Sequence, residues 1–257
     1  MRKLIIAGNW KMYKTIGETI ELANGLKREL YDLGTETVDV VICPPFTSLS
    51  EAAEVVLNSN IALGAQDIYW QEEGAFTGEV SPLMLKDAGV KYVIIGHSER
   101  RQFFGETNDT VNKKIKAALK HGLLPIMCVG ESLKDREASL TFKVLEDQVS
   151  GGLKDLTEEQ MIKLIIAYEP VWAIGTGKTA TPAQAQEAHK YIRDMVIKLY
   201  NKSIGAGLRI QYGGSVKPEN TKELMGQPDV DGALVGGASL KVDSFSNIVK
   251  NSSEVKK

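Results

Sequence analysis

Short apolar runs, rich in β-branched residues, recur along the chain, and each gives way to polar or turn-forming residues. They occupy residues 4–9, 38–44, 61–66, 92–97, 123–131, 164–170, 208–214 and 232–237. Several are apolar almost throughout, which is typical of strands buried on both faces of a parallel sheet. The pattern therefore predicts eight buried strands.

Amphipathic helical periodicity fills the intervals between these runs. Apolar side chains follow a 3.6-residue period at positions 16, 20, 23, 26 and 30, and again at 185, 188, 192, 195 and 199. Thr181 and Pro182 predict a helix start, because threonine is a favoured N-cap and proline a favoured first residue. His121 and Gly122 predict a helix end.

Eight strand–helix units without an intervening linker predict an α/β fold, a single-domain (β/α)8 barrel. We expect the barrel to form a catalytic domain over residues 1–250, followed by a polar C-terminal tail at 251–257. A doubly wound open sheet of eight strands is the alternative fold.

The composition and net charge of the chain exclude several classes of protein and several kinds of partner. The chain has 257 residues, of which 43% are apolar and 25% charged, and these values exclude disordered, collagen-like and coiled-coil proteins. Its 31 basic and 33 acidic side chains leave a net charge of −2, and no segment concentrates Lys and Arg. We therefore expect neither nucleic acid nor a membrane as partner. Lys113, Lys114 and Lys116 are interpreted as a solvated helix face.

The two cysteines, Cys43 and Cys128, cannot form a disulfide framework and are consistent with a reducing compartment. Both end predicted strands, where we expect small core residues. The first apolar stretch is too short for a signal peptide, and no uncharged apolar run approaches the ~20 residues of a membrane span. A cytoplasmic protein is the expectation.

Polar residues that follow the predicted strands are the candidates for chemistry, because barrel enzymes carry their active sites at the carboxyl ends of the strands. They are Asn9, Lys11, His97, Glu169, Ser215, Gly236 and Gly237. A carboxylate among apolar neighbours is costly unless it is partnered or functional, which makes Glu169 the strongest candidate. His97 precedes a predicted helix, whose positive dipole end should keep the imidazole neutral.

Glycine-rich turns point to an anionic ligand. The pairs in YGGS (212–215) and GGAS (236–239) let backbone N–H groups approach an anion where barrels commonly bind phosphate. GTGKT (175–179) lacks the first glycine of a nucleotide P-loop, so we expect a lid instead. The three histidines have no carboxylate at ligand spacing, and no metal site is predicted.

Five segments together resemble triosephosphate isomerases. They are GNWKM (8–12), GHSERR (96–101), YEPVWAIGTGKTA (168–180), IQYGGSV (210–216) and DGALVGGASL (231–240). The resemblance covers essentially the whole chain and implies the TIM-barrel form of the (β/α)8 fold. It also implies a cofactor-independent aldose–ketose isomerase of glycolysis and gluconeogenesis. Such an enzyme interconverts dihydroxyacetone phosphate and D-glyceraldehyde 3-phosphate through an enediol(ate).

By position, the resemblance assigns roles to individual residues. Glu169 would be the base and His97 the electrophile, while Lys11 would supply positive charge and Asn9 would donate to the substrate. The groups binding phosphate would be Gly175, Ser215, Gly236 and Gly237. The supporting residues would be Glu99, Tyr212 as the latch of a lid at 170–180, and Ile174 and Leu234 pressing on Glu169.

The resemblance further implies a homodimer, in which the loop around Thr77 inserts into a partner subunit and reaches its active site. Two residues depart from the family's pattern near that contact. Asp67 stands where Asn is common, and Tyr13 occupies a variable position often filled by Asn. Both residues lie near the expected contact between the subunits.

Two other functions stay open at this point. A Schiff-base aldolase could use Lys11, although this residue lies beyond the strand in a polar turn, whereas an activated lysine requires a desolvated pocket. A non-catalytic phosphate-binding barrel is the other, and the presence of both Glu169 and His97 argues against it.

Overall fold

The fold comes from a computed structural model that describes residues 2–34, 36–174 and 179–255. Eight parallel strands form its centre, and each lies within one of the predicted apolar runs. They are β1 (Leu4–Asn9), β2 (Val38–Cys43), β3 (Ile61–Ala65), β4 (Tyr92–Ile95), β5 (Leu124–Val129), β6 (Ile165–Tyr168), β7 (Arg209–Tyr212) and β8 (Gly232–Val235).

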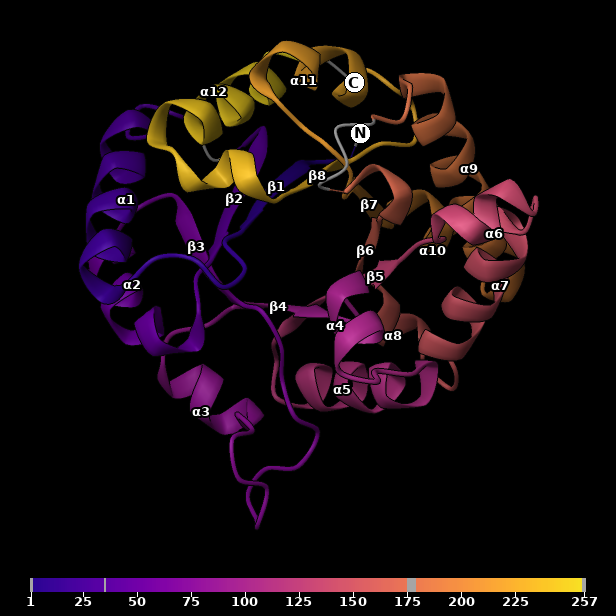
Figure 1. Cartoon of the computed structure of the whole chain (residues 1–257), viewed down its shortest axis with the longest axis horizontal. Coiled ribbons are helices and arrows are strands. Elements are labelled where there is room, and N and C mark those ends of the chain that lie inside the picture. Colours follow the sequence, from indigo (N-terminus) through magenta and orange to yellow (C-terminus); the bar gives the residue numbers. More distant parts are fainter. Residues whose placement is uncertain (1, 35, 175–178, 256–257) are drawn as a thin grey trace.

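The sheet is closed, which excludes the open doubly wound alternative. β1 pairs with β2 on one side, with Ile5 opposite Asp39, and with β8 on the other, with Ile5 opposite Gly232. All neighbouring pairs are parallel, and the strands follow one another around the barrel in chain order (Figure 1). The predicted (β/α)8 barrel is confirmed.

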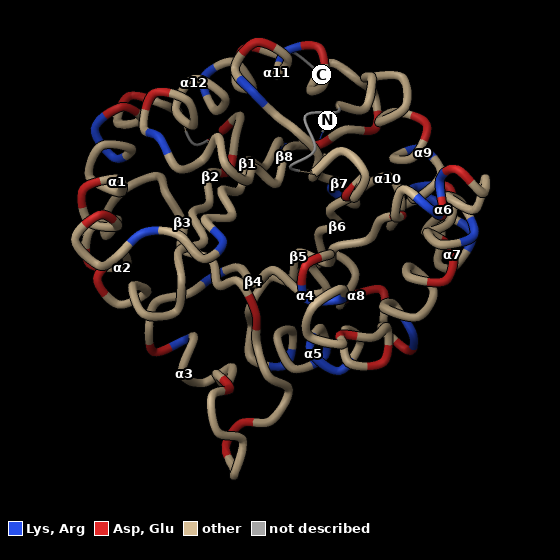
Figure 2. The backbone as a smooth tube through the Cα atoms, in the orientation of Figure 1, with Lys and Arg blue, Asp and Glu red and all other residues tan. Residues whose placement is uncertain are grey.

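Helices surround the barrel on its outer side, with charged residues of both signs interspersed around this ring (Figure 2). The α-helices are α1 (Ile16–Glu29), α2 (Leu49–Val56), α3 (Pro82–Asp87), α4 (Ser98–Phe103), α5 (Asn108–Lys120), α6 (Leu133–Glu137), α7 (Thr141–Gly152), α8 (Glu158–Met161), α9 (Pro182–Leu199), α10 (Lys202–Gly207), α11 (Pro218–Met225) and α12 (Val242–Ser253). Short 3-10 helices occur at η1 (Phe46–Ser48), η2 (Val171–Ala173) and η3 (Gly237–Leu240). None of the helices in the described ranges is long and apolar enough to cross a membrane.

Alternate residues of each strand belong to two separate cores, because successive side chains of a strand point to opposite faces. In β1, Leu4 and Ile6 pack outward against the helices, whereas Ile5 and Ala7 fill the barrel. Cys43 and Cys128 belong to the barrel interior, where both are fully buried and free. This confirms their interpretation as small core residues.

Helix ends mostly follow the predicted signals. The Thr181 hydroxyl accepts the Gln184 amide at the start of α9, and Gly122 adopts a φ of +75° just after α5. The C-terminal boundary differs, because α12 continues to Ser253 and passes the expected end of the barrel at residue 250. Ser252 is buried there, and its hydroxyl donates to the Ile248 carbonyl, so a polar residue fits within the packed helix.

Two predictions about helix surfaces are wrong. Lys114 does not lie on a solvated face: its side chain is only 6% exposed and its ammonium pairs with Asp67 and Glu106. Lys114 lies on the same side of α5 as the buried Val111 and Ala118, one turn away in each direction, whereas the Lys113 side chain is half exposed. In α1, Ile16 and Ile20 are exposed, because the buried stripe is centred on the Leu22–Leu26 side of the helix.

Candidate active site

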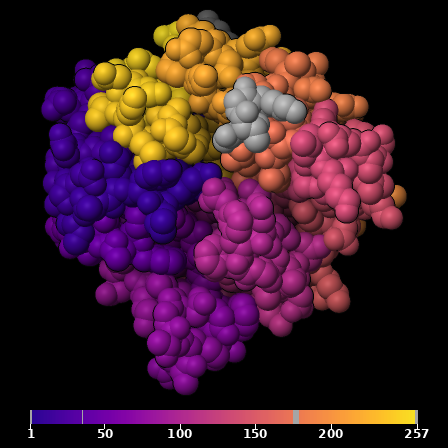
Figure 3. Space-filling view, viewed as in Figure 1, coloured from indigo at the N-terminus to yellow at the C-terminus, as the bar shows by residue number. Residues whose placement is uncertain are grey.

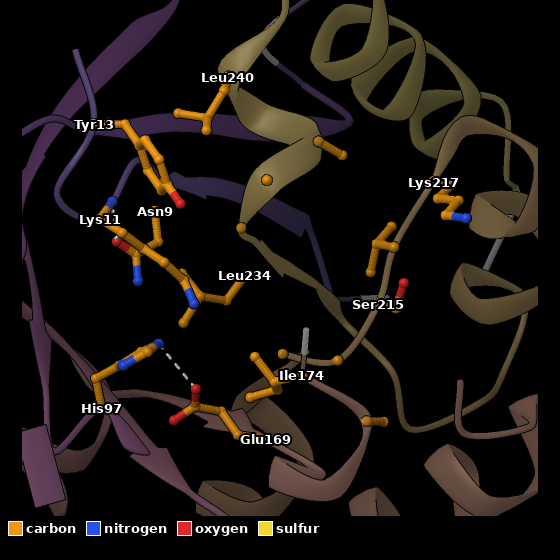
Figure 4. A pocket seen from close by; sticks show the side chains of 17 residues that line it. Asn9, Lys11, Tyr13, His97, Glu169, Ile174, Ser215, Lys217, Leu234 and Leu240 are labelled. Carbon is orange, nitrogen blue, oxygen red and sulfur yellow. Dashed lines mark hydrogen bonds and ion pairs between the residues drawn. The ribbon is translucent and has the colours of Figure 1, made fainter. Parts of the chain in front are cut away.

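A pocket of about 340 Å³ opens at the carboxyl ends of the strands (Figure 4). Its lining is Asn9, Lys11, Tyr13, His97, Glu169, Ala173, Ile174, Gly213, Gly214, Ser215, Val216, Lys217, Leu234, Gly236, Gly237, Ala238 and Leu240. Except for Gly175, which lies outside the described residues, every residue predicted to catalyse or to bind substrate lines this one pocket. Parallel strands make this convergence possible, since all their carboxyl ends meet at the same rim of a barrel.

Glu169 follows β6 and is buried, with 2% of its surface exposed. Its Oε1 lies 3.0 Å from His97 Nε2, and the Ser98 amide and hydroxyl donate to the two carboxylate oxygens at 3.0 and 3.1 Å. Burial acts to raise the pKa of Glu169, but His97 and the Ser98 donors outweigh it and hold that pKa below its ordinary value. The carboxylate is therefore ionised and able to accept a proton.

Two glycines leave room for Glu169. A Cβ on Gly213 would lie 2.9 Å from Glu169 Cγ, and a Cβ on Gly130 would overlap the Glu169 carbonyl oxygen. The first glycine of the YGGS turn is thus required beside the carboxylate side chain, in addition to any part in binding an anion. Sequence reasoning missed this packing role because it depends on the approach of β6 to β5 and β7.

His97 is the N-cap of α4, where its Nδ1 accepts the Glu99 amide at 3.2 Å. A proton on Nε2 and none on Nδ1 satisfies both this bond and the contact with Glu169, so the neutral tautomer fits the geometry. Burial lowers the pKa of His97, but the Glu169 and Glu99 carboxylates raise it, and the net direction is upward. This net direction is opposite to the downward shift that the helix dipole alone would give, because two carboxylates face the ring.

Lys11 is held in an uncommon conformation, with a φ of +52°. Its amide donates to Asn9 Oδ1 at 3.0 Å, and its carbonyl accepts from Gln66 Nε2 at 2.8 Å. Its ammonium pairs with Glu99 at 2.5 Å, as expected for a supporting carboxylate. Gln66 also donates to the Cys43 carbonyl at 2.9 Å, which ties the turn after β1 to β2.

The second glycine pair lies beside Lys11, since a Cβ on Gly236 would lie 3.5 Å from Lys11 Cε. Gly236 is the N-cap of η3 and Gly237 its first residue. Ser215 and Lys217, which follow β7, line the same pocket (Figure 4). Lys217 was missed by the sequence reasoning, although its place two residues after Ser215 in GGSVK is a usable signal. Tyr13 was assigned to the subunit contact, yet it also lines the pocket.

A buried carboxylate after β5 anchors the segment that leads into the predicted lid. Glu131 is fully buried, and its Oε1 accepts from Trp172 Nε1 at 2.8 Å, Tyr168 Oη at 3.1 Å and an Arg136 nitrogen at 3.1 Å. Sequence reasoning did not select Glu131, although it stands directly after an apolar run. The lid's core, residues 175–178, lies outside the described residues.

Tyr212, predicted as the latch of the lid, is fully buried at the end of β7. Burial raises its pKa to about 12, while the nearby Ala180 amide acts in the opposite direction. Ala180 is the last residue of the predicted lid segment, so Tyr212 faces the C-terminal end of that segment. Leu234 and Ile174, which were predicted to press on Glu169, line the same pocket as Glu169. Thr77 is exposed on a projecting loop and does not line this pocket.

Within the described ranges, no group of three or more His, Cys, Asp or Glu side chains is arranged to hold a metal ion. The pocket instead combines a buried carboxylate, an imidazole and an ammonium with glycine-rich turns. Such an arrangement can remove a proton from carbon, stabilise the oxyanion that results and bind an anionic group.

Comparisons with known proteins agree with this chemistry. A family model described as Triosephosphate isomerase matches residues 4–252. A protein of Carboxydothermus hydrogenoformans named triosephosphate isomerase is 61% identical over 254 residues, or 98% of this chain and 100% of the relative. Proteins of the same name from Citrifermentans bemidjiense and Geotalea uraniireducens are 58% and 59% identical over 252 residues; the matches cover 98% and 97% of this chain and 100% and 99% of the relatives. The chain belongs to the triosephosphate isomerase family.

Proposed function

We propose that this chain interconverts dihydroxyacetone phosphate and D-glyceraldehyde 3-phosphate through an enediol(ate), as a single catalytic domain of glycolysis and gluconeogenesis in the cytoplasm. The observation that carries the proposal is the buried Glu169–His97 pair, 3.0 Å apart, in a pocket shared with Lys11 and two glycine-rich turns. The relatives' names supply the substrates.

The proposed reaction begins when Glu169 takes a proton from C1 of dihydroxyacetone phosphate. The electron pair of the C–H bond forms the C1=C2 double bond, and negative charge develops on the C2 oxygen. His97, with its proton on Nε2, gives that proton to this oxygen and takes one from the C1 oxygen. Glu169 then returns its proton to C2, which leaves an aldehyde at C1.

The other pocket residues stabilise negative charge on the substrate and hold the substrate in position. The Lys11 ammonium stabilises the enediolate and the phosphate, and Asn9 donates to the substrate while its Oδ1 holds the Lys11 amide. Ser215 and the backbone N–H groups of Gly236 and Gly237 bind the phosphate, with Gly175 joining them from the lid. Binding the non-reacting phosphate in this way orients the carbon atoms against Glu169.

The Schiff-base alternative is disfavoured by the same geometry. The Lys11 ammonium is 2.5 Å from Glu99 and partly exposed, whereas a lysine that forms a Schiff base requires a desolvated pocket. A coupled assay with D-glyceraldehyde 3-phosphate tests the proposed function, and borohydride trapping with substrate tests the alternative. Turnover without trapping is the expected result, and absence of turnover would contradict the proposal.

We also propose a homodimer formed through the loop around Thr77. Large apolar side chains are exposed in segments that follow the adjacent strands β1 to β4. They are Met12, Tyr13, Phe46, Phe76, Met84, Phe103 and Phe104, and Met12 is 94% exposed. Exposed apolar groups gathered on one side are typical of a protein interface. Size-exclusion chromatography with mass measurement tests the dimer.

A further inference from the structure

A long segment after β3, residues 66–81, projects from the body of the molecule and is called the β3 loop below (Figures 1 and 3). Its residues from Glu73 to Glu79 are exposed. Its backbone is nevertheless closed on itself: the Tyr69 amide donates to the Val80 carbonyl at 2.9 Å across the base. The Glu79 amide donates to the Phe76 carbonyl at 3.0 Å near the tip.

Aromatic packing inside the β3 loop sets the course of its chain. The Tyr69 ring lies 4.1 Å from the Trp70 ring and 4.7 Å from the Phe76 ring, measured between centroids. Gly74 adopts a φ of +140°, and a Cβ there would lie 2.6 Å from the Phe76 ring. The path from the base to the tip therefore depends on contacts that the loop makes with itself.

Helix α5 holds the same loop from the side. The buried Lys114 ammonium is 2.7 Å from Asp67 Oδ1, and the Lys113 ammonium lies 5.6 Å from the centre of the Trp70 ring. Further along α5, Glu72 pairs with Lys120 at 2.5 Å and, just past the helix end, with His121 at 3.1 Å. Residues 113 and 120, and likewise 114 and 121, are seven positions apart, which is about two helical turns, so one side of α5 faces the loop.

We infer that α5 and the aromatic cluster Tyr69–Trp70–Phe76 keep the β3 loop in its docking shape in the free chain, so that a second copy of the chain binds a preformed loop. The inference rests on the proposed homodimer. A loop that became ordered only on contact would lose conformational entropy at that step, and this loss would weaken association. Contacts within one chain remove the cost before the subunits meet.

Hydrogen exchange in a monomeric chain tests the preformed shape directly. Thr77→Glu places a charge at the proposed interface and is used at a concentration where sedimentation gives the monomer mass. We expect the Tyr69 and Glu79 amides to exchange at least tenfold more slowly than in an unstructured chain, because their carbonyl partners lie within the same subunit. Exchange at unstructured rates would overturn the inference.

Gly74→Ala tests whether the shape matters for association, because it displaces the Phe76 ring without removing any side chain of the loop. We expect the dimer dissociation constant to rise at least tenfold in the full chain, mainly through slower association. Gly122→Ala is the matched control: Gly122 also has a positive φ, of +75°, but no neighbour of its Cβ position lies within 4 Å. It should leave association unchanged.

The outcomes separate this inference from the proposals on which it depends. If Gly74→Ala and the unaltered chain had the same dimer dissociation constant, the shape of the free loop would not matter for association. The inference of a preformed loop would then be overturned. An unaltered chain that stays monomeric at all concentrations would overturn the dimer, and the preformed docking shape would fall with it. If the unaltered chain showed no isomerase activity, the proposed reaction would be contradicted. The hydrogen-exchange and association measurements on the β3 loop would keep their meaning, because neither of them depends on activity.

Discussion

His97 Nε2 and Glu169 Oε1 lie 3.0 Å apart, at the ends of β4 and β6. The proposed reaction requires both atoms to contact substrate, so their mutual contact must be exchanged for contacts with the bound triose phosphate. Each group thus satisfies the other while the pocket holds no substrate, and neither is buried without a partner. Both predictions about the reaction follow from this pair.

Replacing Glu169 by Gln keeps the size of the side chain but removes the base. We expect kcat to fall by at least ~10³-fold, within the range for general-base catalysis. KM should change much less, because the groups that bind phosphate are untouched. Steady-state kinetics in both directions measures both constants, and a variant that kept most of its kcat would show that another group is the base.

The same variant should lower the pKa of His97. The Glu169 carboxylate is the main cause that raises this pKa, while burial lowers it. With a neutral Gln at 169, burial is opposed by Glu99 alone, so the imidazole should lose its proton at a lower pH than in the unaltered chain. Nitrogen NMR of labelled His97 measures the shift, and an unchanged or higher midpoint would contradict the assignment of the cause.

Shortening the segment 174–178 should slow turnover without unfolding the barrel. The Trp172 anchor on Glu131 precedes this segment, and the strands do not depend on it. Loss of enclosure should also let the enediolate lose phosphate, which yields methylglyoxal. Product analysis measures this, with circular dichroism as the control for folding. Unchanged turnover without methylglyoxal would exclude a lid here.

Thr77→Glu should weaken self-association and lower activity together, since an unpaired charge buried between subunits is costly. Activity measured over a dilution series and compared with sedimentation gives both quantities. Lys163→Glu, on the exposed surface after α8, serves as a charge-changing control. A fully active monomer would contradict the claim that the β3 loop completes the partner's site.

Asp67→Asn should leave the melting temperature at pH 7.5 unchanged or raise it. Burial raises the pKa of Asp67, although Lys114 and Arg100 oppose it. A raised pKa in the folded state means that the ionised carboxylate weakens folding above that pKa. The difference between the variant and the unaltered chain should therefore shrink as the pH falls through the pKa of Asp67, as thermal unfolding at several pH values can show.

Much of the site could be predicted because the functional residues of this fold stand directly after the strands, whose carboxyl ends all meet at one rim. Each strand ends within two residues of the end of its apolar run, so Asn9, His97 and Glu169 could be placed on one rim from their positions alone. Glu131 follows β5 in the same way but was not selected, since its donors Trp172 and Tyr168 come from another strand and the loop after it.

Periodicity and motifs in the sequence by themselves determined the eight strands, the barrel and the candidate catalytic residues, because these depend on neighbours along the chain. Which side chains meet across the barrel depends instead on how the strands and loops pack in three dimensions. Lys114 is buried because Asp67 and Glu106 approach from two separate loops, and the pKa of His97 rises because β6 brings Glu169 beside it. Burial and charge pairing depend on distances between residues far apart in sequence, and a local pattern does not contain those distances.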